Sequence, residues 1–283
     1  MVTGRQSMTK SNNQSAENSS ENFYKLSIQV SLNGLSFCVA DTLKNAILIG
    51  EHVNFGKELS PYEVQRELKE VLREHNIHEM EISDVVVIHR NPLFNLVPKA
   101  LFDKNELANY LKFNTKILAT DLIEYDELES YDVVNVFVPY MNINNFVFDL
   151  FGEFEFVHNG TILLQSLLKS VGNTSEPICY INVGYRQMDM IVISRKQLIF
   201  YNSFNFHTKE DFVYYLLFSF EQLDLDPENI PLRLFGFIEE GDELYNICYE
   251  FIRNISIYIH DNTYTLSGET KEPELDFTVL NAL

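Results

Sequence analysis

The feature that most restricts the fold of this chain is a meander of three short strands that leads into a capped helix. Apolar and polar residues alternate over residues 24–32 (YKLSIQVSL), which is the period of a half-buried strand. Asn33-Gly34 follows directly and predicts a hairpin turn. Residues 35–39 then return as a second strand, and residues 46–53 supply a third. The sequence therefore predicts three adjacent antiparallel strands.

The elements that follow alternate between helix and strand. Ser60 and Glu63 form a capping box, with a proline at the first helical position between them. Residues 85–88 and 133–138 (VVNVFV) are continuous apolar runs, typical of strands inside a sheet that helices cover. A second helix is predicted between them at 103–113.

The second half of the chain repeats this order. It has the same meander, a helix that begins at Thr208 with Asp211 at its third position, and the same alternation afterwards. In chain order the predicted elements are strands at 178–183, 188–193 and 197–201, a helix from 208, a strand at 232–238, a helix at 242–252 and a strand at 255–259.

Each half reads β-β-β-α-β-α-β, the topology of the ribonuclease H-like fold. Two such lobes in one chain make the actin-like fold of actin, Hsp70 and the sugar kinases, an α/β class in which we expect a mixed five-stranded sheet in each lobe. The predicted organisation is a disordered Ser/Asn/Gln-rich tail at 1–22, a first lobe at 23–140, an inter-lobe connection at 141–176 with a short strand (153–157) and a helix (161–169), a second lobe at 177–260 and a C-terminal extension at 261–283.

Charge and composition limit the partners of such a protein. Forty-one acidic residues against 21 basic ones give a formal net charge of −20, which repels the phosphates of nucleic acids. The acidity either keeps the protein soluble or serves a basic partner. No apolar run reaches the roughly 18 residues that cross a bilayer, and the first residues lack the apolar core of a secretion signal. Cys38, Cys179 and Cys248 lie far apart among apolar neighbours, as free buried thiols do in a reducing compartment. We expect a cytoplasmic protein.

Two longer motifs carry a resemblance to a known family. They are KLSIQVSLNGLSFCV at 25–39 and VPYMNINNFVFDLFGEFEFVHNGT at 138–161. With them the chain resembles an uncharacterised bacterial family, a domain of unknown function with an actin-like ATPase fold. It is more distantly similar to actin-like ATPases of pilus assembly and cell division. That similarity implies ATP held between the lobes by two phosphate-binding hairpins, one after the first strand of each half, each with an aspartate near a glycine.

The hairpins of this chain depart from that pattern. The first reads Ser-Leu-Asn-Gly-Leu-Ser around Asn33 and Gly34, with neither aspartate nor lysine. In the second, Asn182 stands two residues before Gly184, where the resemblance implies an aspartate. An amide cannot supply the negative charge that holds Mg²⁺ and aligns the attacking water. The resemblance also implies an adenosine loop with paired glycines after the fourth strand of the second half, where this chain has only Phe235-Gly236-Phe237 and, further on, Gly241.

Two hypotheses remain open from these residues. In the first, the protein is a degenerate, non-catalytic actin-like protein that needs no cofactor and acts through contacts with a protein partner or with itself. In the second, it is a divergent ATPase that binds ATP and Mg²⁺ between the lobes. Under the second hypothesis Asn33, Gly34, Asn182 and Gly184 are the candidate nucleotide-binding residues.

Other candidate sites are weaker. His75 and His78 have the helical spacing of a metal pair, but no third ligand is identifiable and a solvated helix end explains them equally well. The acidic run 121–132 is interpreted as a solvated connection. A ribonuclease H-type nuclease is excluded because the first strand carries no carboxylate. Tyr214, Tyr215 and Phe218 exceed what one buried stripe of their helix needs, so this helix is either buried on several sides or exposes an aromatic face for self-association or a partner.

Overall fold

The computed structural model describes residues 6–8, 23–172, 175–260, 264–266 and 275–283. The chain forms two compact units. Unit 1 comprises Met1–Leu163 together with Asn262–Leu283, and unit 2 comprises Leu164–Asp261. The structure therefore divides the chain differently from the sequence prediction. The predicted inter-lobe connection is shared between the units, and the predicted C-terminal extension returns to unit 1.

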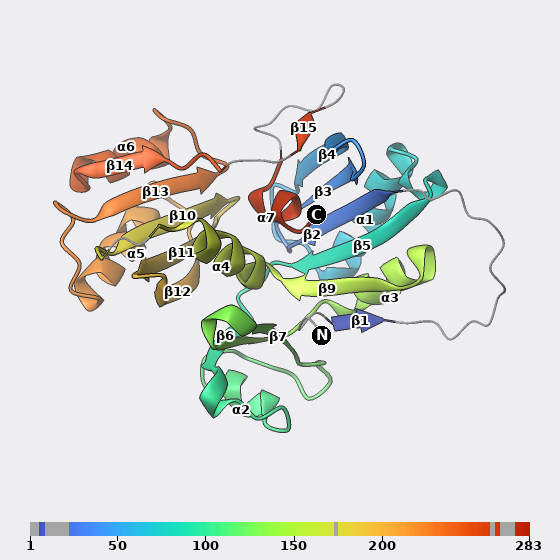
Figure 1. Ribbon diagram of the computed structural model, residues 1–283, viewed down its shortest axis with the longest axis horizontal. Coiled ribbons are helices and arrows are strands. Elements are labelled where there is room, and N and C mark those ends of the chain that lie inside the picture. The colour runs from blue at the N-terminus through green and yellow to red at the C-terminus, as the bar shows by residue number, and fades with distance from the viewer. Residues whose placement is uncertain (1–5, 9–22, 173–174, 261–263, 267–274) are drawn as a thin grey trace. The chain divides into compact units, whose positions relative to one another are not determined.

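Unit 1 is built on a seven-stranded sheet in the order β1-β9-β5-β2-β3-β4-β15 (Figure 1). The three strands of the predicted meander pair antiparallel, and β5 and β9 continue the sheet in parallel on the other side of β2. The strands are β1 (Gln6–Met8), β2 (Tyr24–Val30), β3 (Gly34–Asp41), β4 (Ala46–Asn54), β5 (Ile82–His89), β9 (Phe154–His158) and β15 (Thr265–Leu266).

The fifth strand of this lobe differs from the prediction. Residues 133–138 were expected to complete the sheet, but β8 (Val133–Phe137) pairs with β6 (Phe94–Pro98) and β7 (Glu124–Leu128) in a separate three-stranded sheet. The position beside β5 belongs to β9 instead. An apolar run predicts that a strand is buried but not which sheet buries it. The predicted helix at 103–113 is only α2 (Leu107–Leu111), which packs on the small sheet.

Two predictions for the ends of the chain also differ from the structure. The tail at 1–22 was predicted to be disordered, but Gln6–Met8 forms strand β1 and pairs antiparallel with β9. The rest of the tail lies outside the described residues. The C-terminal extension adds β15 to the edge of β4 and ends in helix α7 (Phe277–Asn281). Added edge strands satisfy backbone groups that would otherwise face solvent.

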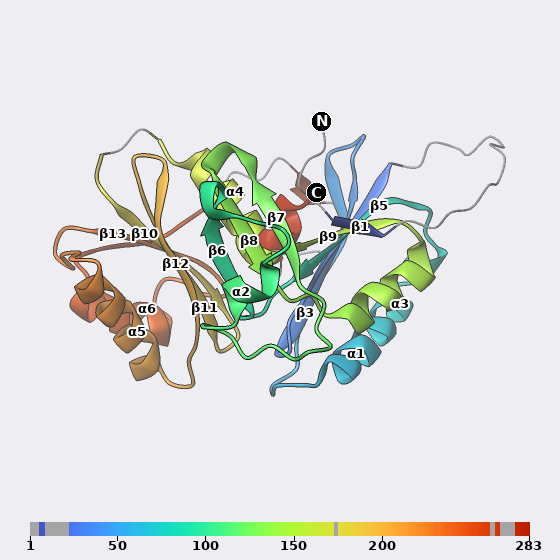
Figure 2. The ribbon, with the colours of Figure 1, turned by 90° about the horizontal axis from the view of Figure 1, so that it is seen from below.

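Helices cover both faces of the unit 1 sheet (Figure 2). Helix α1 (Pro61–Glu74) begins at the predicted capping box of Ser60 and packs with α3 (Met141–Phe151) on one face. On the other face, apolar side chains of α7 join β3 and β5 in one core cluster. The remaining helical segments of the unit are the 3₁₀ turns Ile77–Glu79, Lys99–Leu101 and Glu129–Tyr131 and the start of α4 (Asn159–Ser170), which crosses in sequence into unit 2.

Unit 2 confirms the predicted repeat. Its five-stranded sheet has the order β12-β11-β10-β13-β14, which matches β4-β3-β2-β5-β9 of unit 1 strand for strand. Helices α5 and α6 pack on one face over an apolar core, and the predicted cap of α5 is a complete box between Thr208 and Asp211. The elements are β10 (Ile178–Gly184), β11 (Gln187–Ser194), β12 (Gln197–Asn205), α5 (Lys209–Gln222), β13 (Pro231–Gly236), α6 (Glu243–Phe251) and β14 (Asn254–Ile257).

Candidate functional site

The first hairpin, between β2 and β3, bonds its own amide groups. The Ser31 side-chain oxygen accepts hydrogen bonds from the backbone N–H of Asn33 at 3.3 Å and of Gly34 at 3.0 Å. The Ser31 N–H and hydroxyl both donate to the Gly34 carbonyl at 2.9 Å. A phosphate-binding turn directs such N–H groups at its ligand. Here two of them are already satisfied within the turn.

Gly34 is also explained by packing. A Cβ atom at this position would lie 2.7 Å from the carbonyl oxygen of Val53 on β4, so only glycine fits without a backbone shift. The carbonyl of Asn33 accepts a hydrogen bond from the Phe55 N–H at 3.0 Å. Both candidate residues of this hairpin therefore have structural roles against the end of β4 and the segment after it.

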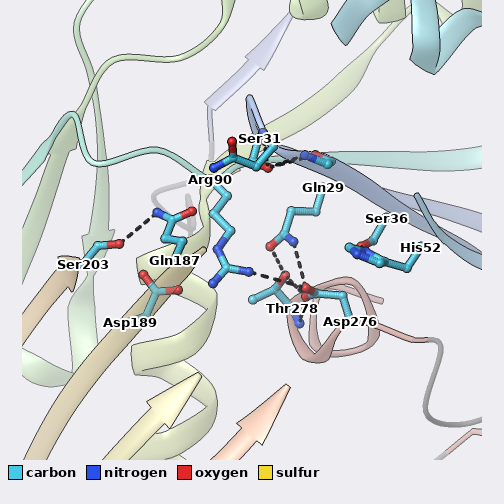
Figure 3. A network of polar contacts seen from close by, with 12 residues as sticks. Gln29, Ser31, Ser36, His52, Arg90, Gln187, Asp189, Ser203, Asp276 and Thr278 are labelled. Atoms are coloured by element: carbon cyan, nitrogen blue, oxygen red, sulfur yellow. Dashed lines mark hydrogen bonds and ion pairs between the residues drawn. The ribbon is translucent and has the colours of Figure 1, made fainter. Parts of the chain in front are cut away.

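A buried polar network lies on the sheet face next to this hairpin (Figure 3). We call Gln29, Arg90, Asp276 and Thr278 the Asp276 network. The Gln29 amide donates to Asp276 Oδ2 at 2.9 Å, and Arg90 Nη1 lies 3.8 Å from the same oxygen. Asp276 also caps α7 by accepting the Thr278 N–H at 2.8 Å, and the Thr278 hydroxyl contacts both Asp276 and Gln29. All four are polar or charged side chains that burial disfavours unless they are paired.

His52 lies on the same face, with Nδ1 2.8 Å from the Ser36 hydroxyl oxygen. Burial lowers the pKa of His52, and the carboxylate of Asp276 opposes this effect. Sequence reasoning missed this whole region. Its central carboxylate stands 247 residues from Gln29 along the chain, so no local pattern connects them.

The second hairpin joins β10 and β11 through Tyr185 and Arg186, with Arg186 in the left-handed region at φ 53°. Asn182 and Gly184 both lie on β10, and Asn182 is 1% exposed. The Nδ2 atom of Asn182 is buried without a hydrogen-bond partner in the part of the chain that the structure describes. An unpaired buried amide is costly, so this donor is a position at which a ligand acceptor would stabilise the protein.

Gly236 at the end of β13 lies against the same side chain. Its φ is +89°, and a Cβ atom there would lie 2.4 Å from the Val183 carbonyl oxygen and 2.6 Å from Asn182 Oδ1. The residue predicted to remain from an adenosine loop is therefore adjacent to Asn182. Its glycine is required by this close backbone approach.

A carboxylate that the sequence analysis did not identify lies beside Asn182. Asp189 on β11 pairs directly with Asn182 across the hairpin and with Ser203 on β12, and it is 1% exposed. The Tyr201 hydroxyl lies 3.4 Å from Asp189 Oδ1. Figure 3 shows Asp189 next to Gln187, whose amide donates to the Ser203 hydroxyl at 2.9 Å. A two-residue turn at 185–186 fixes the register, so this pairing was available from the sequence.

The four predicted nucleotide-binding residues thus fall into two pairs. Asn33 and Gly34 lie together in the first hairpin of unit 1, and Asn182 and Gly184 lie together on β10 of unit 2. The first pair is occupied by contacts within its own unit. In the second, Asn182 has a free buried donor next to Asp189.

The acidic run at 121–132 is not merely a solvated connection. Residues Glu124–Leu128 form β7, and Asp126 is buried. Its Oδ2 accepts the His158 N–H at 2.9 Å and the Thr161 hydroxyl at 2.7 Å, while Asn135 of β8 donates to His158 Nδ1 at 3.0 Å. We call Asp126, Asn135, His158 and Thr161 the His158 junction. It joins the small sheet to the end of β9, so His158 and Thr161 of the motif at 138–161 serve this join.

Histidines and cysteines are used structurally. His75 Nε2 lies 2.5 Å from Glu51 Oε2 on β4 and its ring packs on Phe37, whereas His78 lies 3.8 Å from Glu79. No group of three or more His, Cys, Asp or Glu is placed to hold a metal ion in the described residues. Burial raises the pKa of all three cysteine thiols, that of Cys248 to about 12, so they are poor nucleophiles. Among the helices that the structure describes, none is both long and apolar enough to cross a membrane.

Comparison with solved structures shows an actin-like ATPase fold. A crystal structure of a Bacteroides thetaiotaomicron protein with actin-like ATPase fold and unknown function is 22% identical, has a TM-score of 0.76, and is matched over 92% of this chain and 95% of that one. PilM in the PilM–PilN type IV pilus biogenesis complex is 12% identical, with a TM-score of 0.55 and coverage of 91% and 97%. The same fold therefore occurs in one protein of unknown function and in one component of a protein complex.

A search of curated proteins finds no significant match to this sequence. The family model described as "Protein of unknown function (DUF3822)" matches residues 13–255, which is most of the chain. This family is consistent with the motifs at 25–39 and 138–161, both of which lie inside the matched region. The chain belongs to the DUF3822 family.

Proposed function

We propose that this protein is a non-catalytic actin-like protein that acts through contacts with other proteins in the cytoplasm. The observation that carries the proposal is the first hairpin, where the Ser31 side chain takes up the N–H groups of Asn33 and Gly34. A turn that has satisfied its own donors must break these bonds before it can hold a phosphate. Asn182 supports the same conclusion, because its amide supplies no charge for Mg²⁺.

The mode of action by contacts has separate support. PilM shares the fold and was solved in a complex with PilN, so the fold is compatible with a role in a protein assembly. The cytoplasmic location rests on the three cysteines, which are all free and buried, as is usual in a reducing compartment.

Nucleotide addition tests this proposal. Only a ligand that binds the native state raises its stability, so millimolar ATP with Mg²⁺ should shift the thermal midpoint by less than about one degree. Phosphate release should stay at background. Ser31→Ala provides an informative variant because it frees the two N–H groups. If the Ser31 contacts close the turn, ATP should protect this variant more than the wild-type protein.

A second candidate function is that of a divergent ATPase. The observation that favours it is the pair formed by Asn182, with its unpartnered buried Nδ2, and the neighbouring carboxylate of Asp189. In this case ATP with Mg²⁺ would raise the thermal midpoint by several degrees, and both Asn182→Ala and Asp189→Asn would abolish the shift. That result would reject the non-catalytic proposal. Glu250→Gln on the exposed side of α6 is a matched control for the loss of one carboxylate.

A further inference from the structure

Helix α5 presents an ordered row of side chains to solvent. Glu210, Tyr214, Phe218 and Glu221 are all exposed and follow one another at spacings of four, four and three residues, which places them on one side of the helix. Tyr214 is 60% exposed and Phe218 is 46% exposed. The core side of α5 is supplied by other residues, among them Phe212, Leu216 and Phe220. The row is therefore not required for the core, and burial of the helix on several sides is not the explanation.

The two exposed rings are held in place. Tyr214 and Phe218 stack with ring centroids 5.9 Å apart and an interplanar angle of 17°. Tyr214 also meets Tyr215 edge-on at 5.6 Å, and Tyr215 stacks on Phe204 of β12 at 4.9 Å. A continuous set of rings thus runs from the edge strand to the surface of α5. Rings fixed in this way lose little side-chain entropy when something binds to them.

The ends of the row are acidic, and the neighbouring cations are already paired. Lys209 Nζ lies 2.9 Å from Glu243 Oε1, and Arg253 Nη1 lies 3.5 Å from Glu228 Oε2. Glu210 and Glu221 have no ion pair within the described residues. The row is therefore two stacked rings between two carboxylates that form no salt bridge within the described residues, and the one cation that acts on Glu210, Lys209, is paired with Glu243. A cation attracted to the face of a ring gains further from carboxylates at the same site.

We propose that the row Glu210–Tyr214–Phe218–Glu221 docks an arginine-bearing segment of a partner protein. A planar guanidinium stacks on aromatic rings and bonds carboxylates in its plane, so it fits rings and acids in one row better than an ammonium does. A second copy of this chain is the weaker occupant, because a symmetric contact through this face would set the same glutamates against one another in a protein of net charge −20. This inference rests on the proposed action through protein contacts and adds a place and a chemistry to it.

The test uses the full chain and a fluorescent nonapeptide in which three arginines alternate with serines and glycines. Fluorescence anisotropy measures its binding at low and at moderate salt. A chain of this acidity attracts any basic peptide, so the decisive variants leave the charge unchanged. Tyr214→Ala with Phe218→Ala should weaken binding about tenfold. The control pair Tyr62→Ala with Phe113→Ala removes two exposed rings of unit 1 and should leave binding unchanged.

Three further comparisons complete the experiment. Glu210→Gln with Glu221→Gln should weaken binding about fivefold and flatten its dependence on salt. Replacing the three arginines of the peptide by lysines should weaken binding, and replacing them by glutamates should abolish it. Circular dichroism and the melting temperature should be unchanged in all variants, since the residues are exposed.

Two results would overturn the proposal. Equal binding of the arginine peptide to wild-type protein and to the Tyr214/Phe218 double variant would mean that only general acidity attracts it. Sedimentation of the wild-type protein as a dimer, with the double variant monomeric, would assign the row to a second copy. Neither result depends on ATP, so failure here is distinguishable from failure of the non-catalytic proposal.

Discussion

The sheets of the two units share five strands in the same order, but their surroundings differ. The unit 1 sheet is extended at both edges, by β1 and by β15, and α7 covers the face beside its first hairpin. The unit 2 sheet ends at β12 and β14, with no further strand beside either among the described residues. The buried polar groups of the two units differ as well. In unit 1 the Asp276 carboxylate accepts several hydrogen bonds, whereas in unit 2 the buried Nδ2 of Asn182 has no hydrogen-bond partner within the described residues.

This difference shows how a repeated lobe acquires separate tasks. The strand order and the capped helix are common to both copies because they specify the fold. Three segments outside the repeat, namely the two chain ends and the small sheet, belong to unit 1, and helix α4 is shared between the units. The stability of unit 1 should therefore depend on distant parts of the chain, and that of unit 2 on its own residues.

The largest expected effect comes from removing residues 275–283. This deletion removes the buried side chains of Leu275, Phe277 and Val279, which exposes apolar residues of β3 and β5 beneath them, and it removes the carboxylate that pairs with Arg90. We expect unit 1 to lose more than about 5 kcal/mol of stability. Hydrogen exchange would detect this as loss of protection in β2, β3 and β5, with protection retained in β10 and β11. Equal loss in both sheets would contradict the proposed independence of unit 2.

A fall in pH should destabilise unit 1 more than unit 2, by somewhat less than the deletion of residues 275–283 does. Burial lowers the pKa of His89 to about 3 and that of His158 to about 4, both in unit 1, whereas His207 and His260 of unit 2 are not buried. Because the unfolded chain binds these protons near pH 6.5, the stabilisation is complete above that pH and is lost as the pH falls towards 4. At pH 5 the two histidines together should cost about 4 kcal/mol.

Urea unfolding between pH 7.5 and pH 5 measures this loss, and hydrogen exchange corrected for intrinsic rates locates it. The replacement His158→Gln removes one titrating group at the His158 junction, so the fall in stability with pH should be about half as steep in this variant. A pH dependence confined to unit 2 would argue against buried neutral histidines as its cause.

The smallest expected effect tests what the units have in common. Ser60→Ala and Thr208→Ala each remove the side-chain half of a complete capping box, on α1 and on α5. Each should cost about 1 kcal/mol, with the loss in its own unit. Ser60→Asp and Thr208→Ser keep an acceptor at the cap and serve as controls. Unequal costs would show that the two helices are not equivalent despite their matching caps.

Local chemistry made much of the fold predictable. The Asn33-Gly34 hairpin, the Ser60 and Thr208 caps and the alternation in the first strand depend on neighbouring residues, and all are present in the structure. The assignment of strands to sheets did not follow, because residues 133–137 (VVNVF) and 154–158 (FEFVH) are both short segments with strand-forming residues. Pairing of β9 rather than β8 with β5 is decided by contacts between distant segments.

Some residues of the candidate site were predictable from the sequence, and others were not. Asn182 was predicted from its position on the first strand of the second half, and the structure puts it beside Gly236. Asp189 was within reach of the sequence, since a two-residue turn pairs it with Asn182. The Asp276 network was not, because the five-residue helix α7 is too short to show a period and its partners lie in the first third of the chain.

The Asp276 network also sets the order of events while the protein is made. Domains usually fold in the order in which they leave the ribosome. Here the polar face of the first sheet closes only when Asp276 and Thr278 reach Gln29, and these two residues are translated after the whole of unit 2. Unit 2 is a single stretch of chain that emerges before them. The lobe whose synthesis begins first is therefore the one completed last, and we expect the apolar side chains that α7 covers to stay accessible to chaperones until residues 275–283 have emerged.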